Sequence, residues 1–143
     1  MSIADYDLSQ YPFVTTADVR FRDLDGMGHV NHAVYLTYFE TARILYYAHL
    51  TGRTEIGQIN MILAEVTASY HAPADFGDHL EVYVRITRIG TKSFDMEYLI
   101  VRPADRRRIA SGRSVQVMYD YRAQQSVPVS DEFRAQVAAA QAS

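Results

Sequence analysis

The sequence predicts an α+β fold in which an antiparallel sheet wraps around one long central helix. Three observations lead to this fold class. A helical segment over residues 32–50 is apolar around most of its circumference, so protein must enclose it. Four later segments alternate apolar and polar residues, as half-buried strands do. Short turns connect the last of these segments, which makes the strands antiparallel neighbours.

The first strand and the helix are predicted from local signals. Residues 14–22 alternate, with Val19 and Phe21 on the inward face. A turn rich in aspartate and glycine follows over residues 23–28. Asn31 is a good helix cap and Gly52 a good helix stop. The polar positions of the helix form one stripe, which comprises Thr37, Glu40, Thr41 and Arg43.

The remaining elements follow in order along the chain. The four alternating segments cover residues 61–70, 80–89, 93–101 and 109–119. Ser130 caps a short final helix that extends to about residue 140. No repeat or second domain is visible, so residues 1–143 are predicted to form a single domain.

Composition restricts the function classes. The 143 residues are 48% hydrophobic and 22% charged, with a net charge of −3 and no cysteine. The charge favours no nucleic-acid partner, and the lack of cysteine excludes disulfides and thiolate chemistry. Neither a signal peptide nor a membrane-spanning run is visible. We therefore expect a cytoplasmic protein with no membrane partner.

The most informative phrase is FRDLDGMGHVNHAVYLTYFE, residues 21–40. Its Asp-Leu-Asp-Gly would suit an aspartyl-phosphate phosphatase, but such enzymes place the nucleophile after a buried parallel strand, which reads as a continuous apolar run. The strand here alternates and carries arginines. A metal site at His29 and His32, with Asp23 or Asp25, lacks a third strong ligand nearby. We therefore expect no metal and no cofactor.

A third interpretation accounts for the whole phrase. Asp25 lies in a turn directly before a helix, and the first N–H groups of a helix have no partner within the helix. Those amides and the positive end of the helix dipole can stabilise an oxyanion. Asp25 can serve as nucleophile or general base, with His29 close enough to assist, while Asp23 caps the turn or pairs with an arginine. This arrangement suits acyl transfer from a thioester.

The phrase Asp-x-Asp-x-x-Gly-His-Val-Asn-His-x-x-Tyr, which begins at Asp23, resembles the hotdog-fold acyl-CoA thioesterases of the 4-hydroxybenzoyl-CoA thioesterase type. It is also similar to the related acyl-carrier-protein thioesterases. The segments 68–73, 77–80 and 88–93 look like later parts of the same fold. The resemblance implies a hotdog fold, with Asp25 as the catalytic carboxylate and the backbone amide of His32 polarising the thioester carbonyl. His29 matches the histidine of the carrier-protein enzymes, but Met27 stands where they have asparagine.

The resemblance also implies a substrate and an assembly. The substrate is an acyl-CoA or acyl-carrier-protein thioester, which Asn31 and Tyr35 would adjoin in addition to capping the helix and packing along it. Arg88, Lys92 and Ser93 bracket a hairpin and could bind the phosphates of coenzyme A, as could the basic cluster 106–108.

Pairing of sheets across a two-fold axis would cover an exposed sheet edge, so a homodimer or homotetramer is predicted. Some hotdog enzymes use a glutamate after the helix instead of the aspartate, and Glu65 is the candidate for that role. The alternative function is a non-hydrolytic protein that binds acyl thioesters on the same fold.

Overall fold

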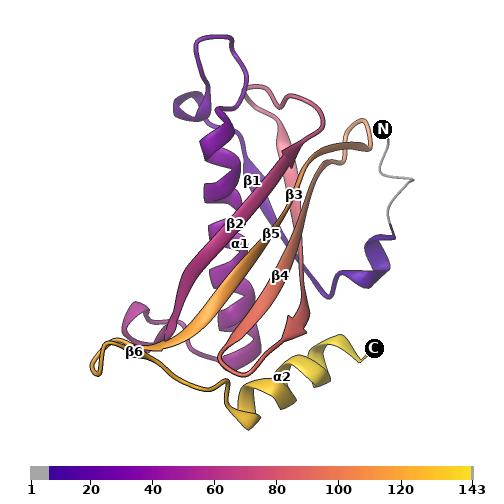
Figure 1. Ribbon diagram of the computed structural model, residues 1–143. Helices are drawn as coiled ribbons and strands as arrows, with labels where there is room; N and C mark the ends of the chain where they lie inside the picture. Colours follow the sequence, from indigo (N-terminus) through magenta and orange to yellow (C-terminus); the bar gives the residue numbers. More distant parts are fainter. Residues whose placement is uncertain (1–6, 143) are drawn as a thin grey trace.

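The computed structural model describes residues 7–142, in which one antiparallel sheet curls around a long helix, as predicted (Figure 1). The sheet order is β1-β3-β4-β5-β2, with the two-residue β6 paired to β5. The strands are β1 (Phe13–Asp18), β2 (Met61–Tyr70), β3 (His79–Ile89), β4 (Ser93–Arg102), β5 (Arg107–Asp120) and β6 (Gln125–Ser126). The helices are α1 (His32–Thr51) and α2 (Asp131–Gln141), with short 3-10 turns η2 (Leu8–Gln10), η3 (Phe21–Asp23) and η4 (Ile56–Gln58).

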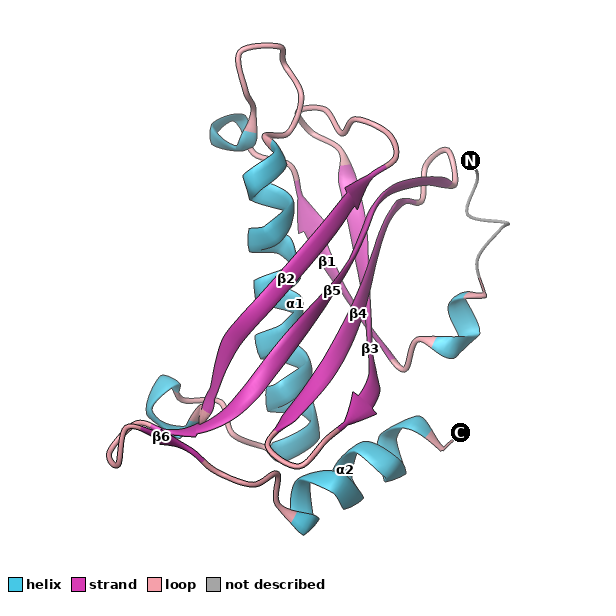
Figure 2. Cartoon of the chain, in the orientation of Figure 1, coloured by secondary structure: helices cyan, strands magenta, loops and turns pink. Residues whose placement is uncertain are grey.

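Helix α1 begins and ends where its capping residues indicate. The side chain of Asn31 accepts a hydrogen bond from Ala33 N, and Gly52 ends the helix at a φ of 73°, a conformation that favours glycine. The sheet covers one side of the helix along its length (Figure 2). Six aromatic and aliphatic residues of α1 are buried against it: Tyr35, Tyr38, Phe39, Ala42, Tyr46 and Tyr47.

The predicted polar stripe of α1 is wrong at one position. Arg43 is only 5% exposed, whereas the apolar Leu45, outside that stripe, is 43% exposed. The helix therefore turns a guanidinium toward the sheet and an apolar side chain toward solvent. Sequence periodicity could not find this, because it sorts residues by polarity and Arg43 is a polar residue on the buried side.

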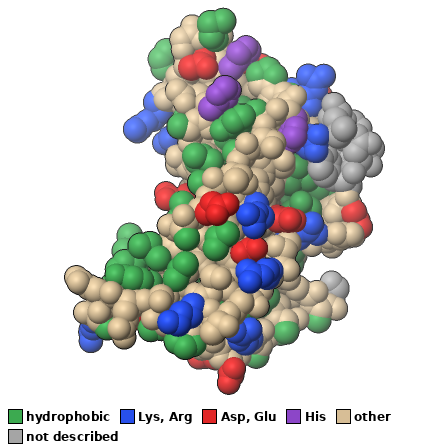
Figure 3. All heavy atoms as spheres, in the orientation of Figure 1, with side chains coloured by type: hydrophobic (Ala, Val, Ile, Leu, Met, Phe, Trp, Pro, Cys, Tyr) green, Lys and Arg blue, Asp and Glu red, His purple; other side chains and the backbone are tan. Residues whose placement is uncertain are grey.

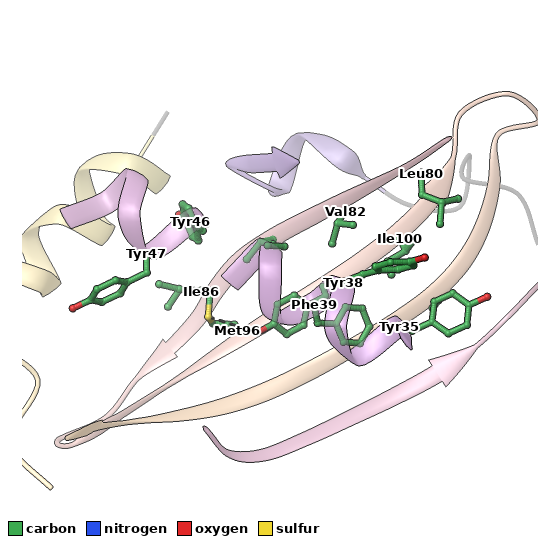
Figure 4. Close-up of a cluster of buried hydrophobic side chains, with 14 of the residues drawn as sticks. Tyr35, Tyr38, Phe39, Tyr46, Tyr47, Leu80, Val82, Ile86, Met96 and Ile100 are labelled. Carbon is green, nitrogen blue, oxygen red and sulfur yellow. Dashed lines mark hydrogen bonds between the residues drawn. The ribbon is translucent and has the colours of Figure 1, made fainter. Parts of the chain in front are cut away.

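The helix and the sheet approach each other most closely at Gly112 of β5. A Cβ atom built on Gly112 would lie 2.5 Å from Phe39 Cε2 and 2.6 Å from Thr67 O, so no larger residue fits without a shift. The ring of Phe39 also stacks on Tyr98 with a centroid separation of 4.6 Å. Figure 4 shows the buried aromatic side chains of α1 among apolar side chains of β3 and β4.

The first strand is shorter than predicted. It ends at Asp18, and Phe21 lies in η3 with its side chain 77% exposed instead of inward. The inward placement of Val19 is correct, since that residue is buried. The chain leaves the sheet here because Asp23 bonds back to the main chain of Arg20 and forms a turn.

One end of the sheet packs against α2, whereas the edge strand β2 is mostly exposed. Near the β3–β4 hairpin, α2 packs across the sheet, with Phe133 beside Phe94 and Val129 N donating to Thr91 O. Strand β2 is an edge with β5 as its neighbour, and most of its residues are exposed.

No helix within residues 7–142 is long and apolar enough to cross a bilayer. The outermost residues of the predicted domain, 1–6 and 143, lie outside the described range.

Candidate active site

The turn between β1 and α1 contains two aspartates in different environments. Asp23 is 2% exposed, and its carboxylate forms an ion pair of 3.0 Å with Arg20 Nη2. It also accepts hydrogen bonds from Arg20 N at 3.0 Å and from Tyr38 Oη at 2.9 Å. Burial would by itself raise the pKa of Asp23, but these hydrogen bonds outweigh it and hold the pKa below its usual value. Asp23 is therefore a structural carboxylate, as its predicted pairing with an arginine implies.

Asp25 is exposed, and only one of its carboxylate oxygens is used by the turn. Oδ1 accepts from Met27 N at 2.8 Å and from His29 N at 3.3 Å. The turn is closed by Asp25 N, which donates to His29 O, and Gly28 adopts a φ of 83° within it. Oδ2 makes no hydrogen bond within residues 7–142. One oxygen thus fixes the side chain while the other is available to a substrate or water.

The start of α1 presents an unused amide next to this turn. The cap Asn31 accepts from Ala33 N and Val34 N, so the second and third amides of the helix have partners. His32 N, the first helical amide, has none in the described part of the chain. The His32 ring stacks on Tyr70 at 4.4 Å, and Tyr70 Oη donates to His32 O at 3.2 Å. These contacts fix the position of the amide.

A chain of charged groups holds His29 from the opposite loop. His29 Nδ1 lies 2.9 Å from Asp75 Oδ1, and Asp75 N donates to Asp78 Oδ2 at 2.9 Å. Arg102 then donates to the same Asp78 oxygen at 2.8 Å and to Pro73 O at 3.2 Å. Because an ionised carboxylate can only accept, the proton of a neutral His29 ring belongs on Nδ1 and the lone pair on Nε2. Nε2 can then exchange a proton with a bound group.

Asp25, His29 and His32 line one cleft of about 470 Å³ between the 23–30 turn, the start of α1 and the end of β2. Figure 3 shows histidine side chains gathered at this end of the molecule. The cleft brings together four residues that the sequence predicted for the site, namely Asp25, His29, His32 and Tyr35. Tyr35 is buried, and its hydroxyl accepts from Ala74 N at 3.3 Å. It therefore supports the cleft floor and the loop that carries Asp75.

The structure does not bring the other predicted residues to this cleft. Arg88, Lys92 and Ser93 lie at the far end of β3 and β4, on the order of 30 Å away at roughly 3.3 Å per residue along β3. Arg88 pairs there with Asp95 at 3.7 Å. The oxygen of Asn31 is used as a helix cap. Glu65, the alternative carboxylate, is exposed on β2 and pairs with Arg113 at 3.4 Å.

Several cleft residues were not singled out from the sequence. Tyr70 and His71 line the cleft and Asp75 contacts His29, although all three are far from the motif along the chain; the 74–75 segment reaches it by pairing with the 29–30 segment. His71 Nε2 lies 2.9 Å from Ser111 Oγ, and burial lowers the pKa of this histidine. The charged Asp-x-x-Asp spacing at 75 and 78 was the available signal, but it is typical of ordinary turns as well.

The geometry also bears on the metal alternative. Within residues 7–142, no three His, Asp or Glu side chains lie close enough together to hold a metal ion. The nitrogen His29 Nδ1 already faces Asp75, and the His32 ring stacks on Tyr70. The two histidines of the motif are therefore arranged by protein contacts.

The cleft thus combines an aspartate with one free oxygen, a free helix-start amide and an oriented histidine. The chain belongs to the thioesterase-like superfamily, whose family model matches residues 19–137. This finding confirms the family that the motif predicted.

The chain is also similar to individual proteins. A thioesterase from Thermus thermophilus, solved in complex with coenzyme A and Zn, is 31% identical and superimposes with a TM-score of 0.85 over 94% of this chain and 97% of that one. The uncharacterized protein YsmA of Bacillus subtilis is 29% identical over 64% of this chain and 62% of its own length. The acyl-CoA thioester hydrolase YbgC of Escherichia coli is 32% identical over 48% and 54%, respectively. The matches thus span less than two thirds of these two curated relatives, while the structural match confirms the hotdog fold.

The environment of Asp23 predicts a pH-dependent stability difference. Because its folded-state pKa lies below the unfolded value of about 3.9, Asp23 stabilises the fold above that pH, and this contribution disappears as the pH falls through the folded-state pKa. Asp23→Asn should lower the free energy of unfolding at pH 7 by about 1–3 kcal/mol, the cost of impairing a buried hydrogen-bonded group. Urea unfolding of both proteins between pH 3 and pH 7 measures this. A difference that stays constant down to pH 3 would contradict the proposed role.

Proposed function

We propose that this protein hydrolyses acyl-CoA or acyl-carrier-protein thioesters to a free acid and a thiol. The observation that carries the proposal is that Asp25, with one free carboxylate oxygen, and His32, with a free backbone amide, line the same cleft. Membership of the thioesterase-like superfamily supports the reaction class. The coenzyme A complex of the Thermus thermophilus relative supports the substrate class.

The start of α1 would stabilise the charge that develops during the reaction. When a nucleophile attacks the thioester carbonyl, its oxygen becomes an oxyanion, which the His32 N–H and the positive end of the α1 dipole can stabilise. The amide needs no reorganisation, because the caps of the next two amides and the His32–Tyr70 contacts already fix it. A donor of this kind contributes roughly 3–4 kcal/mol to lowering the barrier.

Asp25 would supply the attacking group. As a general base it takes a proton from water, which attacks the carbonyl carbon; as a nucleophile its free oxygen attacks and forms an acyl-aspartyl anhydride that water then hydrolyses. Either route forms a tetrahedral intermediate whose collapse breaks the C–S bond and releases a thiolate. In the general-base route, the lone pair of His29 Nε2 can receive from Asp25 the proton taken from water and pass it to that thiolate, because Asp75 holds the ring by its other nitrogen; in the covalent route the thiolate takes its proton from solvent.

Replacing Asp25 by asparagine tests this proposal. The new side chain keeps an oxygen that can accept from Met27 N and His29 N, so the turn should be retained, but it can neither attack nor take a proton. We expect kcat to fall by at least about a hundredfold with little change in substrate binding or thermal midpoint. The measurement is thiol release over a panel of aliphatic, aryl and carrier-protein thioesters.

Asp23→Asn is the matched control, assayed below the thermal midpoints of all three proteins. It should stay within a few fold of the wild-type kcat, because Asp23 is buried beneath the turn and does not line the cleft. A folded Asp25→Asn enzyme with nearly full activity would exclude Asp25 from the mechanism. A wild-type protein that binds the thioesters without hydrolysing them would favour the non-hydrolytic alternative.

We also propose that the functional unit is a homodimer in which β2 pairs with β2 of a second copy. Strand β2 is an uncovered edge, and such edges pair readily with other chains. Large apolar side chains are exposed on the strand, at Ile62 and Leu63, and elsewhere on the chain, at Ile56 and Tyr121. Figure 3 shows apolar surface gathered at the end of the molecule where β6 and the start of β2 lie. A second copy would cover this surface and adjoin the cleft.

Sedimentation velocity tests the dimer. The wild type should sediment as a dimer or tetramer at micromolar concentration, and Ile62→Lys should shift it toward the monomer, because a charge on the edge opposes pairing. The control is Val14→Lys on β1, whose side chain is similarly exposed at 45% but lies on the opposite edge of the sheet. Wild-type protein that sediments only as a 16.3 kDa species would contradict the proposal.

Two basic clusters are candidates for the phosphates of coenzyme A. Arg106 in the β4–β5 turn and Arg107 at the start of β5 are exposed, two to three residues before Ile109, whose carbonyl accepts from the cleft residues His71 and Ala72. Arg88, Lys92 and Ser93 lie at the other end of the sheet, so they can serve a cleft only if it belongs to another subunit. We therefore propose that Arg106 and Arg107 bind the nucleotide within one chain.

Two double variants separate these clusters. Arg106→Met with Arg107→Met should raise KM for acyl-CoA more than it lowers kcat, and should spare short thioesters that lack the nucleotide. Arg88→Met with Lys92→Met should leave KM unchanged if coenzyme A is bound within one chain. A rise in KM for the second double variant alone would assign the phosphates to the β3–β4 hairpin and to a neighbouring subunit.

A further inference from the structure

A second cavity, of about 410 Å³, lies between the middle of α1 and the sheet, well away from Asp25. Along α1 it is on the order of 16 Å from the His32 amide, since eleven residues at about 1.5 Å each separate His32 from Arg43. Its walls are mostly apolar and its floor is polar. The walls include Ile44, Leu45, Met61 and Leu63, with Arg43 and Gln116 below, and the exposed side chain of Glu40 also lines the cavity.

The guanidinium of Arg43 is buried but poorly satisfied. Arg43 is 5% exposed, and its one hydrogen bond within residues 7–142 is from Nη1 to Tyr98 Oη, at 3.2 Å. Glu40 forms an ion pair with Nη2 at 3.8 Å, which is too long for a hydrogen bond, and its side chain is 65% exposed. A guanidinium has five N–H donors, so most of them are unused here. Because its ion-pair partner in the described chain is this distant and exposed carboxylate, the guanidinium keeps donors for a closer anion.

Apart from Glu40, the groups beside Arg43 carry no charge. Tyr98 Oη hydrogen-bonds to Ser114 Oγ, and Gln116 Nε2 donates to the same Ser114 oxygen at 2.8 Å. All three are uncharged at neutral pH, and Ser114 and Gln116 are each 1% exposed. They form a polar floor that orients the guanidinium toward the cavity without supplying a negative charge.

We propose that this cavity binds a carboxylate attached to an apolar body. The planar fork of an arginine matches a carboxylate in a bidentate pair, and that pair is strongest where water is excluded. The apolar walls would bury the rest of the ligand. In the dimer proposed above, the partner subunit would cover the mouth of the cavity, while its floor stays within one chain because Arg43 and Gln116 belong to α1 and β5.

Such a carboxylate could have two sources. A free fatty or aryl acid carries one carboxylate, which is the chemical class that thioester hydrolysis releases. In an intact acyl thioester the first carboxyl group is tied to sulfur, so only an acyl group with a second, distal carboxylate could reach Arg43. Both sources present the same group to the cavity, and binding of the free acid is independent of turnover.

Calorimetric titration with straight-chain acids from hexanoate to dodecanoate tests the site. Wild-type protein should bind the acids more tightly as the chain lengthens, and the matching neutral alcohols at least about tenfold more weakly, one factor of ten for the lost charge pair. Arg43→Met should remove this preference for acids. Leu45→Trp, a change at a partly exposed wall position, should block the cavity while leaving the guanidinium in place. The control Arg22→Met removes an exposed guanidinium and should bind as wild type does.

The two sources separate in a kinetic experiment. Arg43→Met should lower kcat/KM for a dicarboxylic monothioester, and not for the monocarboxylic thioester of the same length, if the distal carboxylate is the ligand. If the free acid is the ligand, both thioesters should react alike and dodecanoate should inhibit the wild type at least about tenfold more strongly than Arg43→Met. The proposal is overturned if acids and alcohols bind equally, if wild type binds neither, or if both Arg43→Met and Leu45→Trp retain the preference for acids. Loss of thioesterase activity alone leaves the titration valid, so the two proposals fail separately.

Discussion

The contact between Phe39 and Gly112 determines how deeply α1 lies in the sheet. The ring occupies the space that any side chain at position 112 would fill, and the main chain of Thr67 in β2 closes the same space from the other side. The depth of the helix sets the position of both its ends, because a helix of 20 residues is close to a rigid rod. The free amide at His32 and the stacking of its ring on Tyr70 depend on this packing, although Phe39 lies two turns away.

The site is held together by a charged connection between two loops. Arg102 at the end of β4 binds the 73–78 loop, and that loop presents Asp75 to His29. The main chain makes the same connection, since Val30 N donates to Ala74 O. Side-chain and backbone bonds therefore fix the histidine relative to Asp25 from both sides. This geometry gives His29 a defined proton-bearing nitrogen, which an isolated histidine in a turn would lack.

The two aspartates of the tetrapeptide Asp-Leu-Asp-Gly differ in burial and in hydrogen bonding. Asp23 lies under the turn, where Arg20 and Tyr38 satisfy it, and the same contact together with burial raises the pKa of Tyr38 above its usual value. Asp25, two residues later, points to the cleft and keeps one oxygen unbonded. The buried carboxylate with a full set of partners supports the turn, and the exposed one keeps an oxygen available to a bound group.

Much of this protein is determined by its sequence alone, because the signals are local. Asn31 and Gly52 fix the bounds of α1 through capping bonds, and alternation fixes β2 to β5 to within two residues at each end. The placement of Asp25, His29 and His32 at one site also follows from sequence, since a single turn and the helix start that follows it contain all three. Contacts between distant segments were decided by the tertiary structure. It brought Asp75 to His29, buried Arg43 against Tyr98 and separated Arg88 and Lys92 from the cleft by the length of β3. Periodicity and motifs report which residues share a face, whereas these contacts depend on sheet order and on the depth of α1, which only the packed chain specifies.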